Sequence, residues 1–274
     1  MPELPEVETI KRELSGKVRN RRIIDCTVLR PEIIAHPDPV SFCRGVRNEE
    51  ILELGRKAKY LIFRLSHEKQ MVIHLRLSGT ISVLAPGQPQ EKYARLTLGL
   101  DGCTLSFNEP RLLGRAYLIR GEETVPCLKG FYELGSEPIS DGFDFEYLKA
   151  KLKHRKAIIK SLLLDQRVCA GMGNIYSDEA LFRAGIRPTR RANRITDREI
   201  RALHRTLKQV IREGIENFGT SVSDYRRTDG TDGNFQKKLY VYGRENEPCR
   251  KCGTMIKVKK IGNRGTRYCP KCQH

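Results

Sequence analysis

The feature that most constrains the fold is a pair of Cys-x-x-Cys motifs near the end of the chain. Sixteen residues separate Cys249 and Cys252 from Cys269 and Cys272. Four thiolates at this spacing suit a tetrahedral structural Zn²⁺. The segment that carries them has too few apolar residues for a core, so the metal must hold it together. We therefore expect a zinc finger over residues 235–274, with one structural zinc ion as the cofactor.

The finger and the whole chain are strongly basic. From Cys249 onward there is no Asp or Glu, and the 274 residues carry a formal net charge of +18 with a pI near 9.7. Such a charge points to a polyanion, either nucleic acid or an anionic membrane. No run is long and apolar enough to span a bilayer, and the N-terminus lacks a signal-peptide pattern. We therefore expect a nucleic-acid partner and no membrane.

The length allows two domains, each with its own core. The remaining cysteines are scattered, and without a secretion signal they are expected to be free, buried thiols. They are Cys26, Cys43, Cys103, Cys127 and Cys169.

The first six residues, Met-Pro-Glu-Leu-Pro-Glu, carry a possible nucleophile. If Met1 is removed, Pro2 has a secondary amine that is partly unprotonated at neutral pH, since α-amino groups titrate near pH 8. Such an amine can attack an electrophilic sugar carbon and form an iminium. Glu3 beside it can move protons. The alternative is structural, in which Pro5 opens a helix over residues 5–14 whose start favours Glu6.

The first half of the chain has the period-2 pattern of β-strands. Alternation over residues 71–78 predicts a strand with one apolar face and with His74 and Arg76 together on the other. Alternation on both sides of Asp101-Gly102 predicts a hairpin with a type I′ turn. With further strands at 60–65 and 116–119, we expect a sandwich or barrel of about eight strands within residues 1–134, behind a helix that stops at Gly16.

Two features of this half look unusual for a plain scaffold. Lys59 precedes an apolar strand within a basic cluster, although a solvated strand end is the simpler interpretation. The turn over residues 108–114 offers Arg111 and then two exposed leucines. Loop leucines usually fold back onto a core, but here they are candidates for a wedge inserted into a base stack.

The second half predicts helices. After a Gly/Pro/Ser-rich linker at 135–142, apolar stripes indicate helices near 145–152, 158–163 and 175–183 within a helical domain over 143–234. A turn around Gly173 precedes the third helix, an arrangement used for phosphate binding. A capping box formed by Thr196 and Glu199 opens a long helix that ends at Gly219. The polar stretch that follows is a long loop, and loops of that length tend to be functional.

Together these motifs resemble the formamidopyrimidine-DNA glycosylase family, the bacterial base-excision enzymes for oxidised purines. The resemblance covers the whole chain and rests on five separated motifs. They are Pro2-Glu3-Leu4-Pro5-Glu6-Val7-Glu8, Arg56-Lys57-Ala58-Lys59-Tyr60-Leu61, Gly173-Asn174-Ile175-Tyr176 with Asp178-Glu179, Phe235-Gln236 with Leu239-Tyr240-Val241-Tyr242-Gly243-Arg244, and the finger with Arg264-Gly265-Thr266.

The resemblance implies an α+β fold, with an N-terminal β-sandwich and a helix–two-turns–helix domain that ends in the four-cysteine finger. It implies that Pro2 attacks C1′ of the damaged nucleotide and that Glu3 donates a proton as the sugar opens. Lys59 would assist β-elimination and Arg264 δ-elimination, and Glu6 joins the catalytic group.

The resemblance also implies DNA contacts along both halves of the chain. These are His74, Arg76, Leu77, Tyr93, Arg111, Leu113, Lys156, Lys160, Gly173, Asn174 and Tyr242. A loop over 220–234 would close over the flipped base, with Ser221, Ser223, Asp224 and Tyr225 as its contacts.

The sequence departs from the family pattern at the wedge. The family usually combines a methionine, an arginine and a phenylalanine, whereas here the positions hold Leu77, Arg111 and Leu113. The family's histidines near Tyr93 and Arg95 are missing, and Glu109 stands where an Asp is usual. These changes leave the chemistry intact and put lesion preference and opposite-base preference in doubt.

We therefore expect a bifunctional DNA glycosylase and AP lyase, acting as a monomer in the bacterial cytoplasm on double-stranded DNA that contains an oxidised base. An endonuclease VIII-like enzyme for oxidised pyrimidines is the nearest alternative, and Leu4 argues against it. A non-catalytic zinc-ribbon protein is the alternative from another class, and it would not need Pro2 and Glu3.

Overall fold

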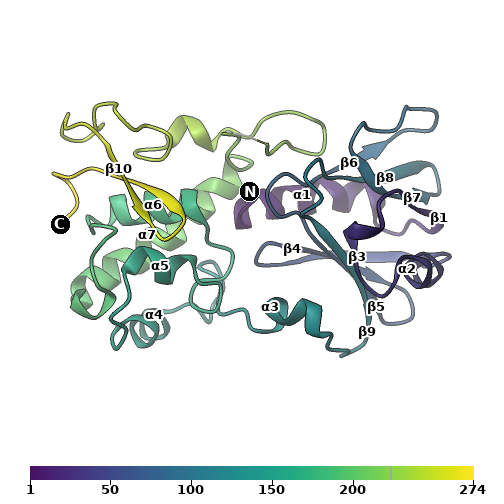
Figure 1. Ribbon diagram of the computed structural model, residues 1–274, viewed down its shortest axis with the longest axis horizontal. Helices are drawn as coiled ribbons and strands as arrows, with labels where there is room; N and C mark the ends of the chain where they lie inside the picture. Colours follow the sequence, from purple (N-terminus) through teal and green to yellow (C-terminus); the bar gives the residue numbers. More distant parts are fainter. Residues whose placement is uncertain (223) are drawn as a thin grey trace. The chain divides into compact units, whose positions relative to one another are not determined.

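The computed structural model describes residues 1–222 and 224–274, so the prediction for Ser223 lies outside the described residues. By its contacts the chain forms two compact units. The first unit comprises Met1–Tyr132 with Phe218–Gly233, and the second comprises Glu133–Asn217 with Asn234–His274 (Figure 1). The loop that was expected to belong to the helical domain therefore packs with the first unit, although it follows the last long helix in sequence.

Helix α1 (Leu4–Val18) opens the first unit and extends past the predicted stop at Gly16. The predicted range of 5–14 was too short. Val18 is fully buried, and its burial stabilises another turn of helix. Gly16 lies on an open surface, with nothing within 4 Å of an added Cβ. A glycine there weakens the helix by about 1 kcal/mol without ending it.

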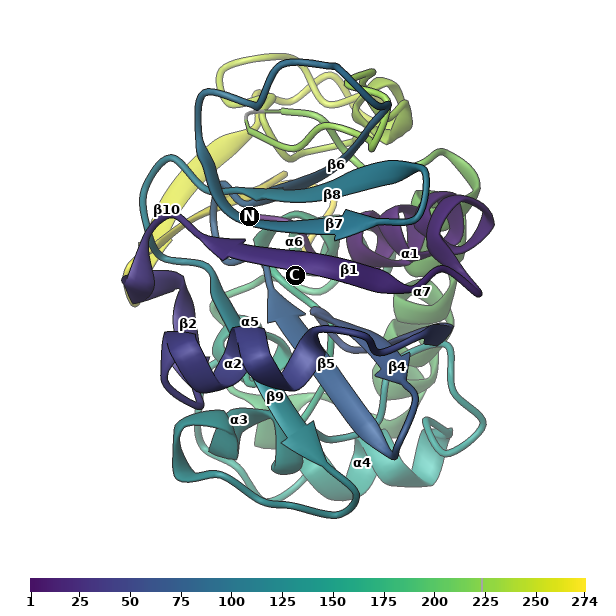
Figure 2. The same ribbon diagram turned by 90° about the vertical axis from the view of Figure 1, so that its right-hand side faces the viewer.

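Two sheets make up the rest of the first unit. One sheet has the order β1-β7-β8-β6 and the other β2-β9-β5-β4-β3, so the described residues hold nine strands here where about eight were expected. The strand bounds are β1 Ile23–Val28, β2 Ile34–His36, β3 Ile51–Lys57, β4 Tyr60–Leu65, β5 Lys69–His74, β6 Thr80–Leu84, β7 Ala94–Leu100, β8 Cys103–Asn108 and β9 Arg115–Arg120. Figure 2 shows the strands of the two sheets running in different directions. Their apolar side chains share one core with α1, which confirms the sandwich.

Strand β5 differs from its prediction. It ends at His74, and Arg76 lies in the following turn with a positive φ of 56°, so the two residues do not share a strand face. Val72 and His74 are as buried as their apolar neighbours. The reason is that this sheet is covered on both sides, since Tyr60 and Phe131 pack in an edge-to-face chain over His74.

The hairpin of β7 and β8 forms as predicted, with Leu100 paired to Cys103. Its turn is not type I′. That type needs a positive φ at both central residues, and only Gly102, at 85°, has one.

The second unit contains the predicted helices α4 (Phe145–Leu152), α5 (Ile159–Leu164), α6 (Asn174–Arg183) and α7 (Asp197–Glu216). The capping box of α7 is confirmed, since Glu199 N–H donates to Thr196 Oγ1 at 3.3 Å and Thr196 N–H donates to the Glu199 carboxylate at 2.8 Å. The helix ends before Asn217, earlier than the predicted end at Gly219. A hairpin of β10 (Lys257–Ile261) and β11 (Arg264–Tyr268) follows in the finger.

Short helices complete the two units. They are α2 (Pro39–Val46), α3 (Lys129–Tyr132), and the 3₁₀ turns η1 (Pro31–Ile33), η2 (Pro126–Leu128), η3 (Ala192–Arg194) and η4 (Phe235–Lys238). In the part of the chain that is described, no helix has the length and apolarity needed to cross a membrane.

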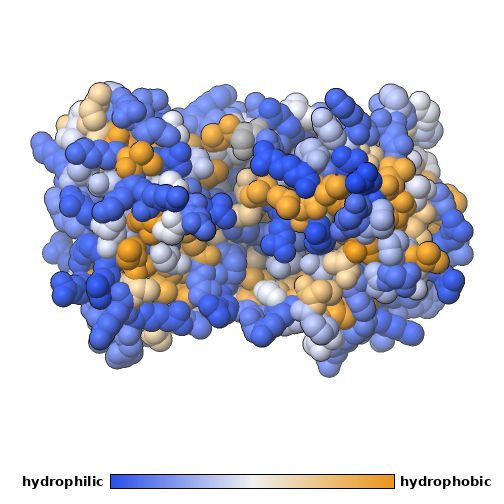
Figure 3. Space-filling view, viewed as in Figure 1, coloured by the Kyte–Doolittle hydropathy of each residue, from blue (hydrophilic) through white to orange (hydrophobic). Residues whose placement is uncertain are grey.

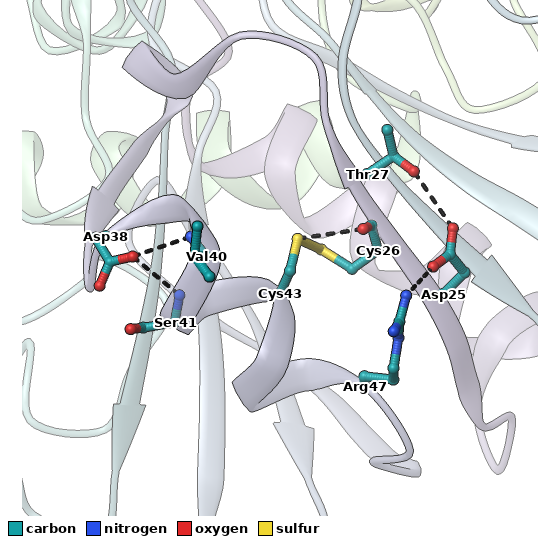
Figure 4. The surroundings of a disulfide bond; sticks show 8 residues. All are labelled: Asp25, Cys26, Thr27, Asp38, Val40, Ser41, Cys43 and Arg47. Atoms are coloured by element: carbon teal, nitrogen blue, oxygen red, sulfur yellow. Dashed lines mark hydrogen bonds and ion pairs between the residues drawn. A yellow bond between two sulfur atoms is a disulfide. The ribbon is translucent and has the colours of Figure 1, made fainter.

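A disulfide overturns part of the cysteine prediction. Cys26 of β1 and Cys43 of α2 are bonded, with their Sγ atoms 2.27 Å apart (Figure 4). An ion pair between Asp25 and Arg47 joins the same two elements. Cys103, Cys127 and Cys169 form no disulfide with the described residues, and of these three Cys169 alone is buried. A separation of 17 residues gave no sign that the packing of α2 against β1 brings the two thiols together.

Candidate active site and nucleic-acid interface

The amino end of the first unit is buried and carries two carboxylates. Pro2 is buried, and Glu3 and Glu6 are 2% and 1% exposed. The Glu6 carboxylate accepts the N–H of Glu3 at 2.7 Å and the N–H of Thr220 at 2.8 Å. Pro5 near the helix start leaves room for this arrangement because it has no N–H of its own. Glu6 thereby joins the amino end to the loop over 218–233, a role that the sequence did not suggest.

The loop over 218–233 is built around this contact. Gly219 has a φ of 80°, and a Cβ there would lie 2.9 Å from the Glu6 side chain, so only glycine fits. Tyr225 is buried in the core, and its hydroxyl donates to Phe218 C=O at 3.1 Å. Burial, followed by the charges of Glu6 and Glu13, raises the pKa of the Tyr225 phenol. The phenol therefore stays neutral and holds the loop closed on itself.

Ser221 also serves the loop's internal structure. Its hydroxyl donates to Tyr225 C=O at 3.1 Å and accepts the N–H of Gly233 at 2.9 Å. Asp224 forms an ion pair at 3.3 Å with Arg111, a predicted DNA contact.

Lys59 lies in the tight turn between β3 and β4 and is 5% exposed. Ala58 beside it has a positive φ of 52°. Arg56 supports the turn by donating to Ala58 C=O at 3.0 Å and to the Glu8 carboxylate of α1 at 3.0 Å. Burial raises the pKa of Glu8, but hydrogen bonds from Arg12, Arg56 and Lys11 outweigh it and lower the pKa overall. This ion pair fixes the Lys59 turn to the helix that carries Glu3 and Glu6.

His74 is a neutral, oriented imidazole. Burial, then the charges of Arg76 and Lys59, lowers its pKa to about 3. The backbone N–H of Arg76 donates to Nδ1 at 3.0 Å. Nδ1 is therefore the acceptor, and Nε2 carries the proton. The Nε2–H of a neutral histidine is a hydrogen-bond donor suited to a phosphate oxygen.

Glu109 organises the predicted wedge loop. It is fully buried and accepts hydrogen bonds from Ser78 Oγ at 2.5 Å and from the N–H groups of Arg111 and Gly114 at 3.0 Å each. Leu113 is 42% exposed, as expected. Leu112 packs against the core, so the turn presents one exposed leucine and not two.

The remaining predicted contacts of the first unit differ in exposure. The Arg111 side chain is 56% exposed and Tyr93 is 42% exposed, whereas Leu77 is partly buried. The Tyr93 ring lies 5.7 Å from the Arg95 guanidinium, and its C=O accepts the N–H of Glu109 at 2.9 Å.

In the second unit, Lys160 does not fit the predicted phosphate contact. It is fully buried and pairs with Asp178 at 2.6 Å. Its ammonium also donates to Asn174 C=O at 2.9 Å and to Ser177 Oγ at 2.8 Å. All three donor directions are thus directed into the protein. Burial raises the pKa of Asp178, and Lys160 opposes that rise. Lys156, in contrast, is exposed.

Asn174 is the first residue of α6 and follows Gly173, the N-cap. Its Nδ2 donates to Gly265 C=O of the finger hairpin at 2.9 Å. Among the described residues, its buried Oδ1 has no hydrogen-bond partner. Asp178 makes a second link to the hairpin by accepting the N–H of Arg267 at 2.9 Å. The helix start and the finger hairpin are therefore held together as one surface, with Arg264 exposed at the hairpin tip.

Glu179 makes a link that the sequence did not reveal. Its buried carboxylate accepts the N–H groups of Tyr240, Val241 and Tyr242 at 2.9–3.0 Å. Burial raises its pKa, and these three hydrogen bonds oppose the rise. The partly buried Tyr242 ring packs under the Arg267 guanidinium at 4.6 Å. The Glu179 contact fixes where Tyr242 lies.

The four finger cysteines fit a zinc ion. Their Sγ atoms all lie within 4.8 Å of one another, with Cys249–Cys272 at 3.9 Å and Cys252–Cys269 at 3.5 Å. A tetrahedral site with Zn–S bonds of ~2.3 Å requires Sγ separations of roughly 3.8 Å. Two backbone N–H groups, of Lys251 and Cys272, point at thiolate sulfurs. The chain therefore supplies a four-thiolate site for one structural zinc ion.

These two units define a protein of the helix–two-turns–helix and zinc-finger class. Three family profiles match the chain in order: the formamidopyrimidine-DNA glycosylase N-terminal domain over residues 1–116, the H2TH domain of the same family over 134–226, and the zinc finger found in FPG and IleRS over 246–274. The chain belongs to the formamidopyrimidine-DNA glycosylase family.

Relatives match over their whole length. The formamidopyrimidine-DNA glycosylases of Pelotomaculum thermopropionicum and Bacillus subtilis are 43% and 40% identical, with 100% of this chain and 99% of each relative covered. The crystal structure of Lactococcus lactis Fpg with DNA that contains Fapy-dG has a TM-score of 0.92 at 32% identity, covering 99% of this chain and 100% of that one. The Thermus thermophilus Fpg structure has a TM-score of 0.91 at 38% identity, covering 99% and 98%.

Proposed function

We propose that this chain is a base-excision repair DNA glycosylase and AP lyase that removes oxidised purines, 8-oxoguanine and formamidopyrimidines among them, from double-stranded DNA. Membership of the family supports the reaction class. The observation that carries the assignment is the buried Pro2–Glu3 end, held by Glu6 against the loop over 218–233. A plain DNA-binding protein has no use for an amino end fixed in this way.

The proposed chemistry begins with removal of Met1, which frees the Pro2 amine. The amine attacks C1′ of the flipped nucleotide, and the base leaves as the glycosidic bond breaks. Glu3 donates a proton to the sugar ring oxygen as the ring opens, and the product is an iminium between Pro2 and the sugar. The iminium acidifies the neighbouring C2′–H, so elimination can release the 3′ phosphate.

The other residues hold phosphate and assist elimination. Lys59 and Arg264 are assigned to β- and δ-elimination, respectively. His74 would donate its Nε2–H to a phosphate oxygen, and Asn174, Gly173, Lys156 and Tyr242 would position the strand from the second unit. The zinc ion supplies no chemistry to the reaction, because four thiolates leave it no open coordination position. We further propose that the protein acts as a monomer in the bacterial cytoplasm, at the nucleoid.

Borohydride trapping tests this function. Added during reaction with a duplex that contains one 8-oxoguanine, borohydride should reduce the iminium and leave DNA covalently bound to Pro2, as located by mass spectrometry. A form with an uncleavable extension before Pro2 should bind the duplex and give no adduct, because its Pro2 nitrogen is an amide. An adduct on Lys59, or normal excision by the extended form, would show that the mechanism is wrong.

A further inference from the structure

A row of five cations follows one face of helix α7. They are Arg198, Arg201, Arg205, Lys208 and Arg212. The spacing of three, four, three and four residues places them on one stripe of the helix. The buried stripe, which includes Leu203, Leu207 and Val210, lies on the opposite side. We call these five residues the α7 stripe.

The cations of the α7 stripe outnumber the carboxylates beside them, which are Asp197 near Arg201 and the pair Glu213 and Glu216, which line a surface hollow with Arg205, Lys208 and Arg212. Within the described residues, none of the five forms an ion pair, and the Arg201 guanidinium lies over the Phe145 ring at 3.7 Å. Like charges three or four residues apart on a helix are destabilising by about 0.2–0.5 kcal/mol per pair. Glu216 lies four residues after Arg212 on the same stripe, so only the end of the row has an acidic side chain in line with it. The excess of cations therefore costs helix stability, and a polyanionic ligand would offset that cost.

A cleft beside the α7 stripe extends the basic surface. It has a volume of about 760 Å³, and Gln209 and Glu213 of α7 form one side of it. The other side carries further cations, which are Lys237, Lys238, Arg250 and Lys251. The one carboxylate that lines the cleft, Glu213, is already paired with Arg183 at 2.8 Å. The net charge of the cleft is thus strongly positive, like that of the stripe.

The composition of this surface favours a nucleic-acid backbone over a protein partner. Protein interfaces are depleted of charge at their centre and contain an apolar core. The large hydrophobic residues that are exposed in the described part of the chain lie mainly in the first unit, and only Met255 and Val258 are in the second, neither of them on α7. On the face seen in Figure 3, the largest apolar band likewise lies over the first unit. Arginine and lysine without an apolar centre are typical of phosphate contacts.

We propose that the α7 stripe and the adjoining cleft bind a second segment of duplex DNA, through its phosphates and without sequence preference. The stripe is about 21 Å long, since its ends are 14 residues apart on a helix that rises ~1.5 Å per residue. That length matches roughly six phosphates of one strand, at ~3.4 Å per phosphate along the duplex axis. A protein with two DNA-binding surfaces can pass between DNA segments without complete release.

The test uses the full-length protein with its lesion site already filled. Protein trapped by borohydride on a short 8-oxoguanine duplex is titrated with a second, undamaged, labelled duplex. The variant is Arg198→Ala, Arg205→Ala and Arg212→Ala together, since these side chains contact no other described residue through a hydrogen bond or ion pair. The matched control is Arg22→Ala, Arg44→Ala and Arg120→Ala together. These three arginines are exposed on the first unit, and replacing them removes the same amount of charge.

The trapped wild-type complex should bind the second duplex, and the α7 variant should bind it at least about tenfold more weakly at low salt. Its slope of log K against log salt should fall by about 2.7, at ~0.9 per lost phosphate contact. The control variant should change neither value appreciably, and both variants should excise the lesion from a short duplex at the wild-type rate.

Three outcomes would overturn the proposal: no binding of a second duplex by the trapped complex, equal loss in the control variant, or displacement of the duplex by polyglutamate of matched charge at the same concentration. The last outcome would instead identify an acidic protein as the partner. Failure of trapping itself would count against the proposed glycosylase mechanism and not against this surface. The number of duplexes bound per protein, measured without borohydride, would then test the surface.

Discussion

The Glu6 carboxylate accepts the N–H of Thr220 at 2.8 Å, and so joins two residues that are 214 positions apart in the chain. Its other oxygen accepts the N–H of Glu3. One buried side chain therefore positions both the residue proposed as proton donor and the loop proposed to cover the lesion. The two N–H groups are satisfied only while Glu6 offers two acceptor oxygens.

Glu6→Gln should loosen this loop. The glutamine amide nitrogen would face one of the two N–H groups, which leaves a buried donor unpaired at a cost of about 1–3 kcal/mol. Hydrogen exchange of the Thr220 amide should become faster, and the free energy of unfolding should fall by a similar amount. The exposed Glu91→Gln serves as the control and should change neither. Unchanged Thr220 exchange in Glu6→Gln would contradict the proposed role.

His74 should make stability depend on pH in acid. Its pKa is about 3 in the folded protein, against about 6.5 in the unfolded chain. Between these values the unfolded chain binds the extra proton, so the free energy of unfolding rises with pH and is lost as pH falls from 6.5 toward 3. The slope from this residue reaches at most about 1.4 kcal/mol per pH unit.

Urea unfolding of wild type and His74→Gln between about pH 5 and pH 7 measures this contribution. The variant should be less stable than wild type at neutral pH, with the difference shrinking as the pH falls. A constant difference across the range would show that the pKa of His74 is the same in the folded and the unfolded protein.

Lys156 and Lys160 should separate binding from stability. Lys160→Met leaves Asp178 buried without its partner, and removing one member of a buried pair costs about 3–5 kcal/mol. Lys156 is exposed, so Lys156→Met should change stability by less than about 0.5 kcal/mol. Lys156→Met should instead lower, by about 0.9, the slope of the logarithm of the duplex-binding constant against the logarithm of the salt concentration. Thermal unfolding and salt titrations of duplex binding should be measured for both variants. Similar effects in the two would contradict a structural role for Lys160 and a phosphate contact for Lys156.

The sequence predicted the elements whose signals are local. The capping box of Thr196, the stripes of α4 to α7, the hairpin of β7 and β8, and the four finger cysteines each depend on residues close together in the chain. Period and spacing are sufficient for such features. The family resemblance then supplied the order of the parts.

Apart from element ends and the turn type at Asp101-Gly102, the failures involve contacts between distant residues. Lys160 and Lys156 look alike in sequence, and only the packing of α5 on α6 buries the first against Asp178. Cys26 and Cys43 gave no sign of their disulfide, and Glu179 gave none of its hydrogen bonds to residues 240–242. Whether a residue is buried depends on which distant parts of the chain pack over it. Local sequence patterns do not show this packing, so the burial of these residues could not be predicted from one sequence.

Cys249→Ser should remove the zinc ion and release the finger from its fold. Three thiolates leave the site incomplete, and a piece with so few apolar residues depends on the metal for most of its folding energy. Metal content by mass spectrometry should fall below one ion per chain, and duplex binding should be lost because Arg264 and the hairpin next to Asn174 are no longer held. Cys127→Ser, at an exposed cysteine outside the finger, should keep both properties. Full duplex binding by the metal-free variant would refute this role.

Arg111 should carry the choice of opposite base. Its side chain is 56% exposed, and its guanidinium pairs among the described residues with Asp224. An exposed ion pair is worth about 0–1 kcal/mol, so DNA can displace that partner easily. Good contacts to a base edge contribute about 1–3 kcal/mol of discrimination. Arg111→Ala should therefore reduce the spread of excision rates across the four opposite bases by that amount, measured on duplexes that contain one 8-oxoguanine.

Leu113→Phe provides the companion test at the same loop. Phenylalanine stacks on a neighbouring base where leucine only fills space, so excision from an intact duplex should become faster. The gain should be smaller on a duplex with a mismatch beside the lesion, because that step is already partly unstacked. Asp224→Asn controls for the ion pair and should preserve opposite-base discrimination, since it leaves Arg111 in place. Discrimination that is equal in wild type and Arg111→Ala would exclude Arg111 as the reader of the unpaired base.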